Sequence, residues 1–375
     1  MRYLCLFLFS FCFLLTACED EEPPEILTPG DLESIEYNPT PHTVEIPEGF
    51  PAMTIPADNP MTEEGFQLGR RLFYDVRLSK DGSMSCASCH LPEMSFTDGV
   101  AFSIGVEGEQ TRRNSMSLVN VGFFENGLFW DGRVHTLEEQ AFMPVTDRVE
   151  LINTWDRVEK MMREDEVYPR MFREAFGISD RSEIDSVLAV KAIAQFERRL
   201  ISANSLYDKV IRENDFSFEF TDSEFRGYEI FFELGSIPGG SGLPDGQCVH
   251  CHGTELFGIG QYFNNGLDSY PTLADYPDKG RGEVTGEFVD FGRFKSPTLR
   301  NIELTAPYMH DGRFNTLEEV IAHYHGGGVK DAENLDANLK EELGLSDQHK
   351  ADLVAFLKTL TDEEFINNPD FQDPF

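Results

Sequence analysis

Two copies of one five-residue pattern constrain this chain more than any other feature. Both have the spacing C-x-x-C-H, at residues 86–90 and 248–252. Two thiols at this spacing can each form a thioether with one haem vinyl group, and the adjacent histidine can bind the iron. A zinc site or a redox-active cysteine pair is the alternative, but two matches at corresponding places in a duplicated chain make it weak. The sequence predicts two covalently attached c-type haems, with these haem-binding residues: Cys86, Cys89, His90, Cys248, Cys251 and His252.

The remaining three of the seven cysteines lie in the N-terminal segment. This segment has one charged residue, Arg2, then an almost wholly apolar run that ends in Leu15-Thr16-Ala17-Cys18. The pattern is typical of a lipoprotein signal peptide over residues 1–17, with the lipid on the thiol of Cys18. The apolar run is too short to span a membrane comfortably. We therefore expect a lipid-anchored protein of the cell envelope, on the periplasmic side or the outer surface of a Gram-negative bacterium.

The charge of the chain limits its partners. The formal net charge is -36, so binding to the phosphates of nucleic acid is excluded on electrostatic grounds. Because opposite charges steer encounter, the acidic balance favours a basic or neutral electron donor. Solubility alone is the alternative explanation of the same charge.

The chain repeats itself after an acidic, Pro-rich tether at residues 18–55. The motif DGR at 131–133 recurs at 311–313, and the motif TLEE at 136–139 recurs at 316–319, so the spacing between them is the same. Shorter echoes relate 69–73 to 227–231 and 117–120 to 298–301. Such repetition predicts two homologous domains with one haem each, over residues 56–215 and 216–375.

Local patterns indicate helices. Apolar residues recur at three- and four-residue spacing over 184–200 (Ile184, Val187, Leu188, Phe196, Leu200) and 353–360. The residues expected to cap helix N-termini are Thr136, Thr316, Ser346 and Thr221, the last in a capping box with Glu224. No segment alternates with period two for long. The prediction is a mainly α fold of two cytochrome c-like helical domains, whose long loops wrap the haems.

From about Pro56 to Thr361 the chain resembles the bacterial di-haem cytochrome c peroxidases and their relative MauG. The resemblance is carried by two motif regions, residues 129–141 (FWDGR and LEEQA) and residues 299–312 (LRN and TAPYMHDG). It implies an enzyme that reduces hydrogen peroxide to water. A small cytochrome c or a cupredoxin would supply the electrons, and members of this family commonly form homodimers.

The resemblance makes the first haem the peroxidatic centre. Glu150 matches the catalytic glutamate of the family, which moves a proton between the two peroxide oxygens. Gln140 matches its hydrogen-bonding neighbour. Many members close this site with a histidine at the position of Val106, and valine cannot bind iron. No other histidine lies between His90 and His135, and His135 is expected to face solvent, so the site is expected to be open.

The second haem would then receive the external electrons. Trp130 matches the family's tryptophan between the two haems, and its oxidisable indole can relay an electron. Trp155 is expected only to pack. The position of the second haem's distal ligand falls on Tyr324, where MauG also has tyrosine; a tyrosinate would lower the haem potential relative to a thioether. Met309 is the next candidate, and His323 and His325 flank the position. His250 and His310 are not expected to be ligands.

A calcium ion between the domains is also implied by the resemblance. The matching positions are the side chain of Asn114 and the backbone carbonyls of Thr305 and Pro307, which are the hard oxygen donors that calcium prefers. Two other functions stay open. One is a MauG-like enzyme that oxidises residues of a partner protein, which Val106 and Tyr324 both favour. The other is a di-haem electron carrier without enzymatic activity, which Val106 disfavours.

Overall fold

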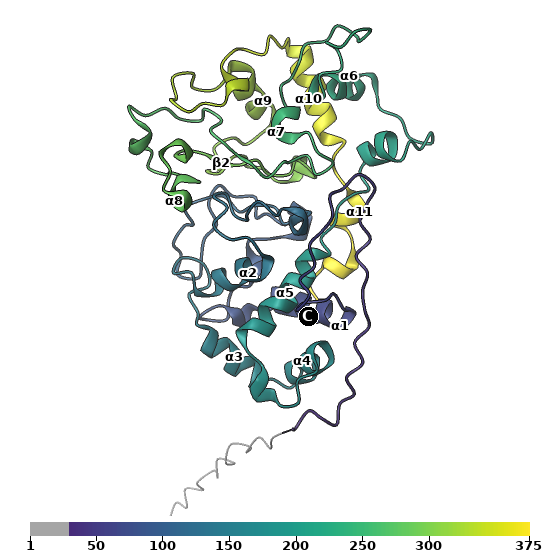
Figure 1. Cartoon of the computed structure of the whole chain (residues 1–375), viewed down its shortest axis with the longest axis vertical. Coiled ribbons are helices and arrows are strands. Elements are labelled where there is room, and N and C mark those ends of the chain that lie inside the picture. The colour runs from purple at the N-terminus through teal and green to yellow at the C-terminus, as the bar shows by residue number, and fades with distance from the viewer. Residues whose placement is uncertain (1–29) are drawn as a thin grey trace, which may run out of the picture.

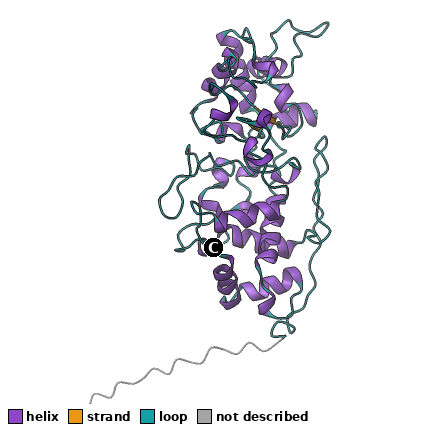
Figure 2. Cartoon of the chain, turned by 60° about the vertical axis from the view of Figure 1, so that its left-hand side comes forward, coloured by secondary structure: helices purple, strands orange, loops and turns teal. Residues whose placement is uncertain are grey.

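The computed structural model describes residues 30–375, which are mainly helical with long connecting loops (Figures 1 and 2). The prediction of a mainly α fold is confirmed. The expected signal peptide (residues 1–17) and the expected lipid-bearing Cys18 lie outside the described residues. Between residues 30 and 375, no helix is both long enough and apolar enough to cross a membrane.

The helices fall into two groups along the chain, and a short two-stranded sheet lies in the second half. The first group is α1 (Glu63–Tyr74), α2 (Leu137–Thr146), α3 (Trp155–Glu164), α4 (Tyr168–Phe176) and α5 (Ser186–Arg198). The second is α6 (Asp222–Phe231), α7 (Val249–His252), α8 (Gly282–Thr285), α9 (Leu317–Gly326), α10 (Asp347–Lys358) and α11 (Glu363–Ile366). Strands β1 (Tyr262–Phe263) and β2 (Phe294–Lys295) are antiparallel.

The expected helix caps are confirmed. The side chains of Thr136, Thr221, Thr316 and Ser346 each accept a hydrogen bond from the backbone N–H three residues later. One expectation about the buried face is wrong: Val187 is 52% exposed, while Ile184, Phe196 and Leu200 are fully buried. Val187 lies in the first turn of α5, on a side of the helix that no other element covers.

Each domain is built on one close helix pair, and a repeated glycine explains how the pair fits. Helix α1 packs against α5, and α6 packs against α10. A Cβ atom on Gly69 would lie 1.9 Å from the carbonyl oxygen of Ala192, and one on Gly227 would lie 2.0 Å from that of Asp352. No side chain fits at either crossing. The glycines that mark the repeat in the sequence therefore allow the same helix packing in both domains.

The first hydrophobic core contains residues from both halves of the chain. The larger core consists of residues from α1 to α5, but Phe365, Ile366 and Phe371 from the C-terminal end also belong to it. The Tyr74 hydroxyl donates a hydrogen bond of 2.5 Å to the carbonyl of Phe371. The second core is formed by α6, α9 and α10 with Tyr207 and Phe257. The C-terminal segment thus returns to the first domain, as Figure 1 shows.

The N-terminal part of the described chain lies along one side of the body (Figures 1 and 2). Leu32 is buried in the first core, and its backbone N–H donates to the carbonyl of Ser179. Phe50 packs with Phe123 and with Leu256 of the second half. The Pro-rich stretch is therefore anchored to the body at Leu32 and at Phe50.

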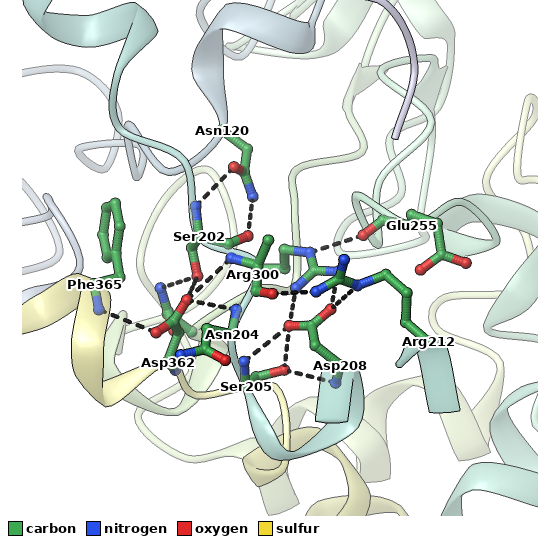
Figure 3. Close-up of polar contacts among 12 residues, drawn as sticks. Asn120, Ser202, Asn204, Ser205, Asp208, Arg212, Glu255, Arg300, Asp362 and Phe365 are labelled. Atoms are coloured by element: carbon green, nitrogen blue, oxygen red, sulfur yellow. Dashed lines mark hydrogen bonds and ion pairs between the residues drawn. The ribbon is translucent and has the colours of Figure 1, made fainter. Parts of the chain in front are cut away.

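Where the chain passes from one domain to the other, buried polar side chains hold the segments together (Figure 3). Asp362 caps α11 and also accepts hydrogen bonds from Ser202, Ala203 and Asn204. The guanidinium of Arg300 makes a bidentate ion pair with Asp208 at 2.8 and 2.9 Å, and both side chains are completely buried. Two charges removed from water must be paired in this way.

Candidate functional site

The two C-x-x-C-H motifs form sites of the same construction. In the first, Nδ1 of His90 lies 2.8 Å from the carbonyl oxygen of Phe96, and in the second, Nδ1 of His252 lies 2.8 Å from that of Phe257. Because a carbonyl only accepts hydrogen bonds, Nδ1 must carry the proton in both rings. Burial lowers the pKa of both histidines, to about 4 for His252, so the rings are neutral. Each therefore presents an unprotonated Nε2, the form that binds iron.

The cysteines of both sites are free thiols. The hydroxyl of Ser115 donates to the carbonyl of Cys89 at 2.7 Å, and the hydroxyl of Ser296 donates to that of Cys251 at 2.6 Å. Burial raises the pKa of the thiols, to about 11 for Cys89 and about 12 for Cys251, so they are uncharged before they react. These matching serine–carbonyl hydrogen bonds show that the duplication includes the contacts around each motif.

A mostly apolar cavity adjoins the first motif. Its walls bring together Cys86, Cys89 and His90 with two side chains that the sequence analysis assigned to catalysis, Gln140 on α2 and Glu150 in the loop after it. The amide oxygen of Gln140 is buried and has no hydrogen-bond partner in the described chain. A cavity with unpartnered polar groups between two thiols and a neutral histidine fits a covalently bound haem.

The carboxyl of Glu150 has a strongly raised pKa. Its apolar surroundings raise its pKa to about 7, and the nearby charge of Asp147 acts in the same direction. Arg133 opposes the shift only weakly. A group with a pKa near the working pH can both take and return a proton.

Glu197 is a second carboxyl in this cavity, and the sequence analysis missed it. It lies on α5, is 3% exposed, and has one oxygen without a hydrogen-bond partner in the described chain. Burial raises its pKa to about 8, so at pH 7 it is an uncharged carboxylic acid. A signal was available, since Glu197 follows Ile193 by four residues and therefore shares the buried face of α5.

The segment around Val106, the position at which many family members have a histidine ligand, packs directly on the loop that carries Glu150. The backbone N–H of Val106 donates to the carbonyl of Glu150 at 3.0 Å. A Cβ atom on Gly105 would lie 1.5 Å from the carbonyl of Val149, so only glycine allows this approach. Gly105 itself lines the cavity. The structure thus places Val106 beside Glu150, and His135 is exposed, as expected.

Trp130 lies at the contact between the two domains. Its indole N–H donates to the carbonyl of Asn114 at 2.8 Å, and its ring centroid is 6.5 Å from that of His310. His310 stacks on Phe294 at 3.5 Å, and burial lowers its pKa to about 4. Trp155 is buried in the first core, as expected for a packing residue.

Two of the candidate ligands of the second haem meet at one amide group. Nδ2 of Asn265 lies 3.3 Å from the hydroxyl oxygen of Tyr324 and 3.3 Å from the sulfur of Met309. Burial, with the nearby thiols of Cys251 and Cys248 as smaller causes, raises the pKa of Tyr324 to about 12. His323 is engaged elsewhere, because its Nε2 lies 2.9 Å from the carbonyl of Asn265. Asn265 had no signal in the sequence.

These two sites define a protein that carries two covalently attached c-type haems, one in each half of a duplicated helical chain. The family model of the di-haem cytochrome c peroxidases matches residues 63–215. The cytochrome c551 peroxidase of Nitrosomonas europaea is 37% identical over 324 residues, which cover 86% of each chain. The MauG protein of Methylorubrum extorquens is 34% identical over 84% of this chain and 83% of its own.

A solved structure of a MauG-like protein associated with microbial copper homeostasis is also similar. It is 37% identical, with a TM-score of 0.79, and the match covers 89% of this chain and 99% of that one. The chain belongs to the family of di-haem cytochrome c peroxidases and MauG. It is therefore an oxidoreductase with two c-type haems.

Proposed function

We propose that this protein is a peroxidase that reduces hydrogen peroxide to water with two electrons from a small cytochrome c or a cupredoxin. The observation that carries the proposal is the convergence of Glu150 and Gln140 on the cavity beside Cys86, Cys89 and His90. A haem held there by Cys86, Cys89 and His90 would supply the iron chemistry of the reaction, binding of peroxide and exchange of electrons. The rest of the reaction is the movement of protons.

Glu150 would carry the proton. As a carboxylate it would take a proton from one peroxide oxygen and deliver it to the other, which would leave as water. The Gln140 amide offers hydrogen-bond donors and an acceptor to the same small substrate. The apolar walls keep the Glu150 pKa close to 7, so neither half of the transfer is strongly uphill.

The pH dependence of the reaction should reflect Glu150. Because its pKa is raised from the ordinary 4.5 to about 7, the carboxylate that accepts the first proton is formed only as the pH rises through 7. We expect kcat/KM for peroxide to rise between about pH 6 and pH 8 and then to level off. Steady-state rates measured across this range check the expectation. A rate that is constant over the range would assign the proton transfer to another group.

Trp130 is proposed as the relay between the two centres. Its position at the domain contact and its hydrogen bond to Asn114 fix the indole between the halves that hold the two haems. The second haem, on Cys248, Cys251 and His252, would receive electrons from the donor. For its distal ligand we propose Tyr324, with Met309 as the alternative, because both lie at Asn265 and Tyr324 is close to both thiols.

We also propose a calcium ion at the domain interface, bound by the Asn114 side chain and by the carbonyls of Thr305 and Pro307. Asn114 is buried, and its Nδ2 donates to the carbonyl of Val100 at 2.8 Å. Within residues 30–375, Oδ1 of Asn114 and the two carbonyl oxygens accept no hydrogen bond. Three unpartnered oxygens of this kind suit calcium.

The peroxidatic site is proposed to be open in the resting protein. Valine at position 106 offers no iron ligand, so prior reduction should not be required for activity. We expect Val106→His to close the site and to convert the high-spin electron paramagnetic resonance signal of the ferric protein to a low-spin one. Val106→Leu is the matched control and should stay high-spin. A wild-type spectrum with two low-spin signals would refute the open site.

Turnover is the direct test of the function. Ferric protein is mixed with peroxide and a reduced small cytochrome c of neutral or basic charge, without prior reduction. A peroxidase oxidises two cytochromes for each peroxide consumed. A MauG-like enzyme is the second candidate, favoured by Tyr324 and Val106. It would consume peroxide without oxidising the donor, and it would instead oxidise residues of a partner protein. Electron exchange with the donor but no peroxide consumption would indicate a carrier.

The cellular setting proposed from the sequence is the cell envelope, with a lipid anchor on Cys18 and assembly into homodimers. An anchored enzyme would meet its donor in the same compartment. Detection of the mature protein in a membrane fraction, and its release by Cys18→Ser, would test the anchor.

A further inference from the structure

Lys295, on strand β2, carries a buried charge for which the described residues provide no counter-ion. It is 5% exposed, and among residues 30–375 its ammonium forms no ion pair with a carboxylate. Nζ instead donates a 2.8 Å hydrogen bond to the carbonyl of Gly127 and lies 4.3 Å from the ring centroid of Phe124. A buried unpaired ammonium is costly, and burial lowers its pKa, whereas the Gly127 carbonyl and the Phe124 ring favour its charged form. Such a group calls for an explanation.

The internal two-fold relation of the domains gives Lys295 a counterpart. The backbone N–H of Asn114 donates to the carbonyl of His310 at 2.8 Å, and that of Lys295 donates to the carbonyl of Trp130 at 2.9 Å. Each bond crosses from one domain to the other. Each donor also precedes the serine that supports a haem motif. Lys295 therefore occupies in one half of the interface the place that Asn114 occupies in the other.

The loops facing these two residues correspond as well. The backbone N–H of Leu128 donates to the carbonyl of Val134 at 2.8 Å, and that of Tyr308 donates to Phe314 at 2.7 Å. This alignment makes Gly127 the counterpart of Pro307. The ammonium of Lys295 thus binds the carbonyl that is equivalent to the proposed calcium ligand of Pro307.

We propose that the ammonium of Lys295 is a built-in cation that takes, in its half of the interface, the position that calcium takes beside Asn114. The inference rests on the calcium site proposed above. Each half of the interface would then contain one cation that links the two domains. Calcium would link Asn114 to the carbonyls of Thr305 and Pro307, and the Lys295 ammonium binds the carbonyl of Gly127. One cation is exchangeable and the other is part of the chain.

The built-in cation acts on Trp130 as a positioning group. Lys295 holds the 124–130 loop at three points: the ring of Phe124, the carbonyl of Gly127 and the carbonyl of Trp130. The loop that carries the relay is therefore fastened to the second domain. The corresponding loop of the second domain, residues 305–310, would be fastened by calcium.

Calcium counting tests the proposal. Haem-loaded wild type and Lys295→Asn are stripped with chelator, dialysed against calcium, and analysed for bound metal. We expect one calcium per wild-type chain and two per Lys295→Asn chain, because asparagine recreates the Asn114 side of the site. Lys295→Met, which offers no oxygen, should stay at one. Equal counts in wild type and Lys295→Asn would overturn the inference.

The reciprocal substitution, Asn114→Lys, provides a second test in case Lys295→Asn does not fold. Asn114→Lys should place a tethered ammonium where calcium binds. Its melting temperature should then be unaffected by chelator, whereas that of the wild type falls. A melting temperature as low as that of chelated wild type, with or without calcium, would overturn the equivalence. No calcium on any of the proteins would refute the calcium site itself, and neither result depends on peroxidase turnover.

Discussion

Glu150→Gln should lower kcat/KM for hydrogen peroxide by about 10²- to 10⁴-fold, the range that a positioned acid–base group contributes. Glutamine keeps the size of the side chain but cannot take up or deliver the proton. The cavity walls, the two thiols and His90 are unchanged by the substitution, so the protein should still attach both haems. Steady-state oxidation of reduced cytochrome c at varied peroxide concentration measures the loss, and the pyridine haemochrome spectrum measures haem content.

Glu109→Gln is the matched control, since Glu109 lies in the neighbouring loop but is exposed. It removes the same charge and should leave kcat/KM unchanged. The variant at position 150 should also lose the rise in rate between pH 6 and pH 8. Full activity of Glu150→Gln with both haems present would transfer the role to another group, and Glu197 in the same cavity would be the first to examine.

The second large effect is on stability. Arg300→Met should destabilise the protein by about 3–5 kcal/mol, the usual cost of removing one partner from a buried ion pair. Methionine fills much of the same space, but it leaves the carboxylate of Asp208 buried with only the Ser205 and Arg212 donors. Urea unfolding followed by circular dichroism measures the change.

Two further variants separate the charge from the packing. Asp208→Asn combined with Arg300→Met should lose less stability than Arg300→Met alone, because the buried carboxylate that Arg300 neutralises is removed as well. Lys160→Met breaks an exposed pair with Glu164 and should cost less than about 1 kcal/mol. If Arg300→Met proves as mild as Lys160→Met, the buried pair does not hold the domains as described.

The parts of the site that the sequence predicts are those carried by short-range patterns. The thiols and histidines of the two motifs need only five consecutive residues, and the caps at Thr136 and Thr316 need four. Glu150 and Gln140 could be selected from many carboxyls and amides only through their spacing from Trp130 in a family motif. The structure brings both of them to the cavity beside His90.

The residues that the sequence could not predict act through partners far along the chain. Lys295 binds a carbonyl 168 positions away, and Asn265 meets Tyr324 across 59 positions. Their neighbours in sequence give no sign of these contacts. The burial of Val187 was wrongly predicted for a related reason. Helical periodicity identifies the apolar face of a helix, but it does not show which residues of that face other elements cover.

The C-terminal segment has a consequence for how the protein matures. Phe365, Ile366 and Phe371 belong to the core of the first haem domain, yet in the chain they follow the helices of the second domain. The first domain therefore cannot complete its core until the residues of the second domain have also been made. Cys86 packs against this same core, so haem can be attached to the first motif before the core around it is complete.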